Sequence, residues 1–427
     1  MKLKEWSLAL VLAGMVGGVG AQSEVSGDVP GADVGSLLAY ARQHHPELAA
    51  MRAETQAAEA RAGAADAMPD PMLKAELVDA YRAAGDEGDR RLTMVPTQVA
   101  ATRYTLSQSL PWWGKRGLRR EVAEARAGEA GHKAESVWRE LARSIRQTFA
   151  RHYLVLARQG FAESNLALLA QLEQVARSRY ETGLGAQQDL IRVQTERSAL
   201  LGELAGMEGE RDELAARTRA LIGVPGRLAL AVPQLLPALP AALPEHAALE
   251  ALVRERNPQL AADEARILAA EKSRELTYKE RYPDVTLGIT PVQTRSRVSA
   301  GDVMIELNIP LQQTRRRHEE REAEAMLDAA RNRRSATVND LLAELDSALA
   351  GLGAARRMDE LISTRLLPQA ELTLQAARVG YETGKVDFAT VLDAQRQVRK
   401  AREDGIKARV EQVSRLADIE RLTGESK

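Results

Sequence analysis

The chain carries one sequence pattern twice. Tyr180-Glu181-Thr182-Gly183 returns as Tyr381-Glu382-Thr383-Gly384, at an offset of 201 residues (381 − 180). Other pairs matched at this or a similar offset are Gln194 with Gln395, Leu110-Pro111 with Ile309-Pro310, and His45-Pro46 with Asn257-Pro258. A repeat on this scale indicates one structural unit built twice, so a fold assigned to one half must also serve the other.

The N-terminus has the pattern of a secretory signal peptide. Lys2 and Lys4 precede an apolar run that ends in small residues at Ala21. The run is shorter than the roughly 18 apolar residues that a transmembrane helix needs. We therefore predict a signal peptide at 1–21, cleaved after Ala21, in preference to a membrane anchor. The chain has no cysteine, so we expect neither disulfides nor a lipidated N-terminus.

Composition narrows the class of protein. The 59 basic residues nearly balance the 60 acidic ones, so nucleic acid is not an expected partner. Aromatic residues make up only 4% of the chain, which favours long packed helices over a compact aromatic core.

The first repeat, 22–231, contains both kinds of periodicity. A helix is predicted at ~36–67, ending before Pro69. Alternating segments predict strands at ~72–80 and ~103–110, separated by a polar loop at 81–102. Helical spacing then runs from 115 to 182, with Gly160 as a potential break, and resumes to about 221 after a tip turn at ~180–186.

The second repeat, 245–427, follows a proline-rich linker at 232–244 and keeps the same order. Its predicted elements are a helix at ~245–280, strands at ~284–291 and ~302–310 around a loop at 292–301, and helices at ~313–382 and ~386–422. The turn between those helices is predicted at ~381–387, and a kink at Pro368. The predicted class is mainly α with a small β part.

The predicted strands have one apolar and one polar face. Lys74 and Glu76 share a face that must meet water, as the lumen face of an outer-membrane barrel does. Four strands cannot close a barrel, and open edges in lipid leave backbone groups unsatisfied. Strands of this kind in a membrane therefore require several copies in one barrel. The alternative is four ordinary amphipathic strands beside a helical domain in water.

Two tryptophans, Trp112 and Trp113, directly follow the second strand. They suit an interfacial aromatic belt at the foot of a spanning strand, or a packed corner between a strand and a helix.

The order helix, strand pair and long helix pair, given twice, resembles the TolC-type outer-membrane efflux protein family. The Tyr-x-x-Gly turns and the segment Val391-Leu392-Asp393-Ala394-Gln395 share the resemblance, which spans nearly the whole mature chain. The segment from Ser107 to Arg116 is most similar to the heavy-metal-efflux branch.

This resemblance implies a homotrimer with a 12-strand β-barrel in the outer membrane of a Gram-negative bacterium, continued by a periplasmic α-helical barrel. The implied partners are a periplasmic adaptor (membrane fusion) protein, an inner-membrane pump of the resistance-nodulation-division type, and outer-membrane lipid. The implied function is a passive exit duct from the periplasm, with heavy-metal cations as one candidate cargo.

The resemblance also implies which residues form the periplasmic tips and aperture. They are Tyr180, Gly183, Asp189, Tyr381, Gly384 and Asp393. A ring of three Asp393 side chains would favour cations; the alternative is a solvated helix residue. Two positions depart from the family pattern, because Thr390 and Val386 stand where an aspartate and a basic residue are common.

No enzyme, cofactor or metal site is predicted. The six histidines include no His-x-x-x-His pair, and there is no cysteine to join them, so a transition-metal site has little basis. Two further functions stay open at this point: a soluble periplasmic coiled-coil scaffold or adaptor, and the outer-membrane duct of a protein secretion system.

Overall fold

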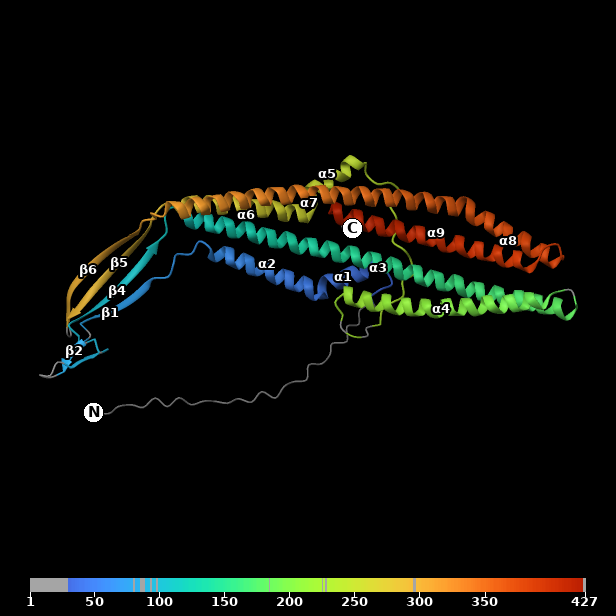
Figure 1. Cartoon of the computed structure of the whole chain (residues 1–427), viewed down its shortest axis with the longest axis horizontal. Coiled ribbons are helices and arrows are strands. Elements are labelled where there is room, and N and C mark those ends of the chain that lie inside the picture. The colour runs from blue at the N-terminus through green and yellow to red at the C-terminus, as the bar shows by residue number, and fades with distance from the viewer. Residues whose placement is uncertain are drawn as a thin grey trace.

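The computed structural model describes residues 30–79, 81–84, 89–92, 94–96, 99–183, 185–224, 226, 229–294 and 297–424. The predicted signal peptide at 1–21 lies outside these residues. The molecule is a long rod with a sheet at one end. At the other end lie two turns, one connecting α3 (Lys115–Glu181) to α4 (Gln187–Leu221) and one connecting α8 (Leu367–Glu382) to α9 (Phe388–Thr423) (Figure 1). No helix in the described ranges combines the length and the apolar character that crossing a membrane requires.

The helices follow the duplicated order. In the first half they are α1 (Val34–His44), α2 (Pro46–Ala64), α3 (Lys115–Glu181) and α4 (Gln187–Leu221). In the second half they are α5 (His246–Arg256), α6 (Pro258–Lys279), α7 (Gln313–Leu361), the π-helical turn η1 (Ile362–Leu366), α8 (Leu367–Glu382) and α9 (Phe388–Thr423).

The prediction of a single helix at the start of each half was wrong. α1 ends before His45 and α2 starts at Pro46, and in the same way α5 ends before Asn257 and α6 starts at Pro258. A proline disfavours helical geometry in the residue before it, and His45 accordingly has extended backbone (φ −70°, ψ 122°). The proline then begins the next helix, where its missing N–H costs nothing.

Gly160 and Pro368, the two residues expected to disturb the long helices, have different effects. α3 runs without a break through Gly160, so that predicted break was wrong. A glycine costs a helix only about 1 kcal/mol, and α3 packs on α2, α4, α6 and α9. Pro368 does perturb its helix, since the π-helical turn η1 ends two residues before it. Proline removes one hydrogen bond and crowds the preceding turn, which a local π-helical turn accommodates.

The main sheet is antiparallel, in the order β1-β4-β5-β6. Its strands are β1 (Met72–Val78), β4 (Ala101–Leu110), β5 (Asp284–Thr294) and β6 (Arg297–Asn308). β4 pairs with β5, so the strand pairs of the two halves meet at the centre of one sheet. β1 and β6 are its edges within the described part of the chain.

Two predicted loops contain more structure than expected. The stretch 81–102 holds a second hairpin, formed by β2 (Tyr81–Ala84) and β3 (Asp89–Leu92). The stretch 292–301 is mostly strand, because β5 and β6 stay paired beyond a bulge at Val292/Gln293. A hydrogen bond of 2.7 Å between the hydroxyls of Thr294 and Ser299 joins the strands there. Polar residues conceal this extension in the sequence, because a strand is recognised there by its alternating apolar residues.

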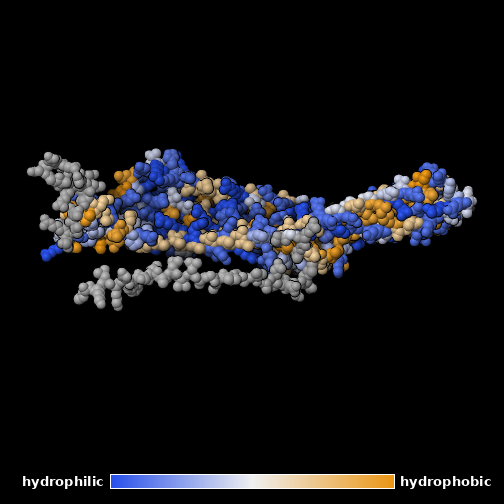
Figure 2. Space-filling model, turned by 90° about the horizontal axis from the view of Figure 1, so that it is seen from below, coloured by the Kyte–Doolittle hydropathy of each residue, from blue (hydrophilic) through white to orange (hydrophobic). Residues whose placement is uncertain are grey.

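The register gives the sheet two distinct faces. Leu106 pairs with Ile289, and Ile289 pairs with Val303, so apolar side chains from β4, β5 and β6 lie side by side. The exposed members of this apolar face are Leu73, Leu106, Leu287, Ile289, Val303, Ile305 and Leu307. Apolar side chains accordingly gather at the sheet end of the molecule (Figure 2).

The opposite face of the sheet is polar. Lys74 lies 3.7 Å from Glu76 on β1, and the hydroxyls of Thr105 and Thr290 form a hydrogen bond of 2.9 Å between β4 and β5. The sheet is therefore amphipathic, as the alternating sequence predicted.

The helical rod is held by a series of small cores. One lies at the tips, between α3, α4, α8 and α9. Another is closed by the proline-rich linker, whose Leu236 and Leu239 pack against Ala150, Val410 and Val413. The linker thus binds the two halves together at mid-length.

Candidate functional site

Both Tyr-x-x-Gly motifs end a helix at the same end of the rod (Figure 1). Gly183 and Gly384 have left-handed backbone, with φ of 75° and 73°. The N–H of each glycine donates to the carbonyl of its motif tyrosine, at 3.0 and 3.1 Å. Glycine favours this helix stop because it lacks the Cβ that opposes positive φ.

The two motif tyrosines have different surroundings. Tyr180 is 45% exposed, whereas Tyr381 is 5% exposed. The Tyr381 ring packs edge-on against Phe388, with ring centroids 5.2 Å apart. The position 201 residues before Phe388 (388 − 201) is Gln187, so only the second repeat supplies an aromatic partner.

Arg179 joins one tip to the other. Its guanidinium lies 4.7 Å from the centre of the Tyr381 ring, and its Nη1 donates to the Tyr381 carbonyl. The pKa of Tyr381 is raised, mainly by burial and further by the negative charge of Asp189, while the positive charge of Arg179 opposes the shift. The Tyr381 hydroxyl is buried with no hydrogen-bond partner among the described residues.

Thr390 and Val386 both contribute to the second turn. Thr390 donates from its backbone N–H to the Asp387 carboxylate at 3.0 Å, capping α9. The Thr390 hydroxyl and backbone N–H together lower the pKa of Asp387. Val386 packs against the tip core. These positions thus stabilise the second turn.

The structure does not bring Asp189 and Asp393 into one described contact. Asp189 lies in the first turn of α4, close enough to Tyr381 for its negative charge to raise the pKa of that tyrosine. The Asp393 side chain on α9 is 67% exposed and lies 3.6 Å from Arg396. A groove between α4 and α9 contains it, together with Arg192 and Glu196. Arg396 also pairs with Glu196 at 2.6 Å, which joins the two helices across this groove.

The repeated glutamines have different roles in the two halves. Gln194 donates to Glu173 within the first hairpin, at 3.1 Å. Gln395 is buried and donates to Asn165 on α3, so it ties the second hairpin to the first. The sequence repeat predicted the position of both but not this difference.

The tryptophans at the sheet end also divide their roles. The ring of Trp112 stacks on Tyr282 at 5.4 Å, and its backbone N–H donates to Asp284 at 2.8 Å. Trp113 is 85% exposed. Trp112 therefore packs the strand-to-helix corner, and Trp113 projects from it.

Lys115 anchors the same corner. It is 4% exposed and its Nζ lies 2.8 Å from the Asp284 carboxylate. The ion pair ties the start of α3 to the start of β5.

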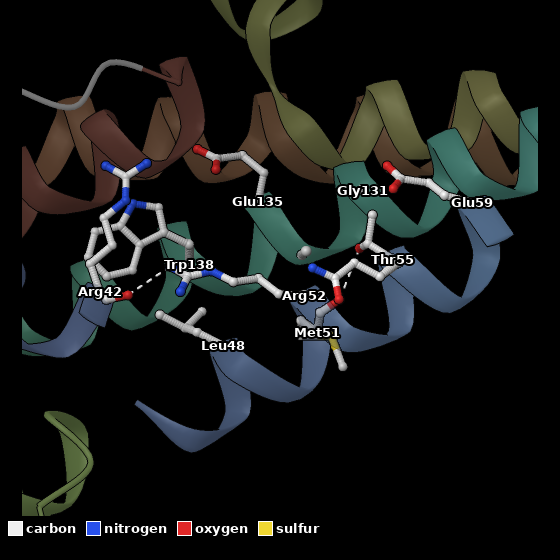
Figure 3. Close-up of a pocket in the computed structure, with 11 residues that line it drawn as sticks. Arg42, Leu48, Met51, Arg52, Thr55, Glu59, Gly131, Glu135 and Trp138 are labelled. Carbon is white, nitrogen blue, oxygen red and sulfur yellow. Dashed lines mark hydrogen bonds between the residues drawn. The ribbon is translucent and has the colours of Figure 1, made fainter. Parts of the chain in front are cut away.

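Sequence reasoning singled out no residue of the cleft between α2 and α3. Arg42, Arg52, Glu59 and Trp138 line it with Leu48 (Figure 3). Arg42 lies 5.3 Å above the Trp138 ring, and Arg52 donates to the Arg42 carbonyl at 2.7 Å. These contacts hold α1, α2 and α3 together. No group of three or more His, Cys, Asp or Glu side chains suited to a metal occurs among the residues described.

The sequence model of a protein family described as "outer membrane efflux protein" matches residues 37–224 and 250–425, most of both halves. The chain belongs to this family. It is therefore an outer membrane efflux protein. This assignment does not favour the alternative of a soluble scaffold or adaptor. Its fold is that of outer-membrane channels, proteins of transport.

Two relatives and two solved structures are similar to the chain. The pyoverdine export outer membrane protein OpmQ of Pseudomonas putida is 22% identical over 92% of this chain and 86% of its own. The cobalt-zinc-cadmium resistance protein CzcC of Cupriavidus metallidurans is 26% identical over 73% of this chain and 74% of its own. The outer-membrane channel OprN matches with a TM-score of 0.79 at 21% identity, covering 92% of this chain and 90% of its own. CusC matches with a TM-score of 0.78 at 19% identity, covering 92% of each chain.

Proposed function

We propose that three copies of this efflux protein pool their sheets into one 12-strand barrel in the outer membrane. The observation that carries this proposal is the amphipathic four-stranded sheet, whose apolar face is exposed and whose edges are β1 and β6 in the described chain. Edges in lipid leave backbone groups unsatisfied at several kcal/mol each. Two copies would give about eight strands, a barrel whose interior its own side chains fill. Three copies leave room for a lumen.

The helices of the three copies would continue the barrel as a tunnel through the periplasm. α3 alone, with 67 residues, extends ~100 Å at 1.5 Å per residue. The tips at Gly183 and Gly384 would then meet a periplasmic adaptor, itself joined to an inner-membrane pump of the resistance-nodulation-division type. The pump would supply the energy, so the duct itself would be passive and not an enzyme.

Heavy-metal cations are the proposed cargo. Support comes from the name of the relative CzcC, a cobalt-zinc-cadmium resistance protein. The relative OpmQ, named for pyoverdine export, makes a siderophore the second candidate. A duct needs no tight metal site, because its cargo must leave.

Deleting the gene for this chain from its own bacterium distinguishes the two cargoes. We expect lower tolerance of cobalt, zinc and cadmium, unchanged siderophore in the medium, and full recovery when the chain is restored. Unchanged metal tolerance with a loss of exported siderophore would overturn the proposed cargo and leave the duct itself intact.

Asp393 is the proposed aperture residue, with Asp189, Tyr180 and Tyr381 beside it at the tips. Its charge does not act alone, because Arg192 and Arg396 line the same groove. We expect Asp393→Ala to shift single-channel selectivity away from cations, since charged rings select by sign. The control is Asp212→Ala, an exposed aspartate near the other end of α4, which should leave the selectivity unchanged. Identical selectivity and conductance in the wild type and Asp393→Ala would contradict an acidic ring.

A further inference from the structure

A groove at the corner between the sheet and the helices is lined mainly by apolar side chains and encloses about 440 Å³. Its lining residues are Met68, Leu110, Pro111, Trp112, Trp113, Gly114, Arg116 and Val285. Leu110 and Val285 are register partners and lie on the apolar face of the sheet. The groove is thus the helical end of that face.

Two cations flank this groove without a carboxylate partner. Arg116 donates from Nε to the backbone carbonyl of Asp66 at 2.6 Å. Lys279 donates from Nζ to the backbone carbonyl of Trp113 at 3.5 Å. Neither side chain lies within ion-pair distance of an acidic group of the described residues. A carbonyl partner leaves each positive charge uncompensated.

Several other cations of the same corner are paired with carboxylates. Arg120 lies 2.7 Å from Glu124, Arg315 lies 2.7 Å from Glu319, and Lys115 lies 2.8 Å from Asp284. Arg316 also donates to a backbone carbonyl, that of Pro310, but it does not line the groove. Arg116 lines the groove directly, and Lys279 contacts it through the carbonyl of the exposed Trp113.

We propose that this corner binds an anionic phospholipid of the periplasmic leaflet, and the proposal rests on the membrane placement of the sheet proposed above. The lipid phosphate lies between Arg116 and Lys279, and an acyl chain follows Leu110 and Val285. Trp113 sits at the headgroup level, where amphipathic rings are enriched. Arginine presents several N–H donors to a phosphate, and lysine acts as a point charge. Each basic residue near an anionic surface strengthens its attraction roughly fivefold.

Lipid retention by the full chain in detergent tests the site. Native mass spectrometry would measure bound phosphatidylglycerol, which is anionic, against phosphatidylcholine, which is zwitterionic. We expect the wild type to retain phosphatidylglycerol preferentially, and Arg116→Gln with Lys279→Gln to abolish the preference. The matched control replaces two paired arginines of the same corner, Arg120→Gln with Arg315→Gln, and should keep it. Equal retention of both lipids by the wild type, or equal loss in the control, would overturn the proposal.

Two further arms sharpen the experiment. Lys279→Gln alone removes only one long hydrogen bond to a carbonyl, so it should fold and weaken the preference roughly fivefold. Inorganic phosphate in millimolar excess should leave the preference unchanged; its loss would indicate a site for free anions and overturn a lipid site. The mass of the same particles separates the two proposals. Three chains without lipid preference contradict only this site, and a single chain contradicts the shared barrel.

Discussion

At the scale of single residues, the tips are asymmetric although their sequence motif is the same. Arg179 contacts both the ring and the carbonyl of Tyr381, and these contacts join the two hairpins. We expect Arg179→Ala to lower amide-exchange protection at the ends of α3 and α8 about thirtyfold, since a partly desolvated cation–π contact and a hydrogen bond are each worth about 1 kcal/mol.

Arg177→Ala is the control for this prediction. Arg177 lies on the same helix, with a mostly exposed side chain 3.8 Å from Glu173, and such surface pairs contribute little. Equal exchange in the two variants would mean that Arg179 does not join the tips.

A second residue, His152, makes stability depend on pH. It is buried on α3, and burial, then the positive charge of Arg211, lowers its pKa. The unfolded chain therefore binds more protons just below the ordinary histidine pKa, so stability rises with pH in that range. We expect the melting temperature to fall between about pH 7.5 and about pH 5.5, and to fall less in His152→Gln. Parallel pH curves for the two proteins would count against this role.

The sequence predicted the tip residues as turn formers but not their contacts. The positive φ of Gly183 and Gly384 follows from the motif itself, because glycine is the usual helix stop. The burial of Tyr381 depends on Phe388, and that contact could have been suspected from one of only three phenylalanines in the chain. The role of Arg179 had no such signal, because arginine is common on every helix here.

At the scale of elements, the corner between α3 and β5 depends on one ion pair. Lys115 is buried, and Asp284 accepts from both its ammonium group and the Trp112 backbone. Breaking a fully buried pair costs about 3–5 kcal/mol, and the one-third exposure of Asp284 reduces this. We expect Lys115→Met to lower the free energy of unfolding by about 2 kcal/mol in a denaturant titration.

A compensating change provides the control for Lys115. Lys115→Met combined with Asp284→Asn removes both charges, so it should recover part of the lost stability. A double variant no more stable than the single one would show that the loss comes from the hydrogen bond of Lys115 Nζ to the Tyr282 carbonyl, and not from the unpaired Asp284 charge.

Element types followed from periodicity and proline placement, but element limits did not. His45-Pro46 and Asn257-Pro258 each mark a helix boundary that a continuous Ala-rich pattern concealed. The β5–β6 hairpin extends through Thr294 and Ser299, whose contribution is a hydrogen bond and not an apolar stripe. Local sequence reports apolar burial well and polar pairing poorly.

At the scale of the whole molecule, the duplication explains why one chain supplies a four-stranded sheet, which is too small to close a barrel by itself. Each repeat contributes two strands, and β4 and β5 join them. The remaining edges, β1 and β6, are antiparallel in a way that lets β6 of one copy meet β1 of the next. The sequence could show that four strands are too few for a barrel, but not which strands complete them, because the proposed partner is another copy of the chain.

The central claim is that three copies share one barrel, and the mass of the purified particle tests it most directly. The chain, extracted from outer membranes in detergent and measured by native mass spectrometry, should give three chain masses with no smaller complex at equilibrium. A particle that contains a single chain, stable and still holding its sheet, would contradict the account.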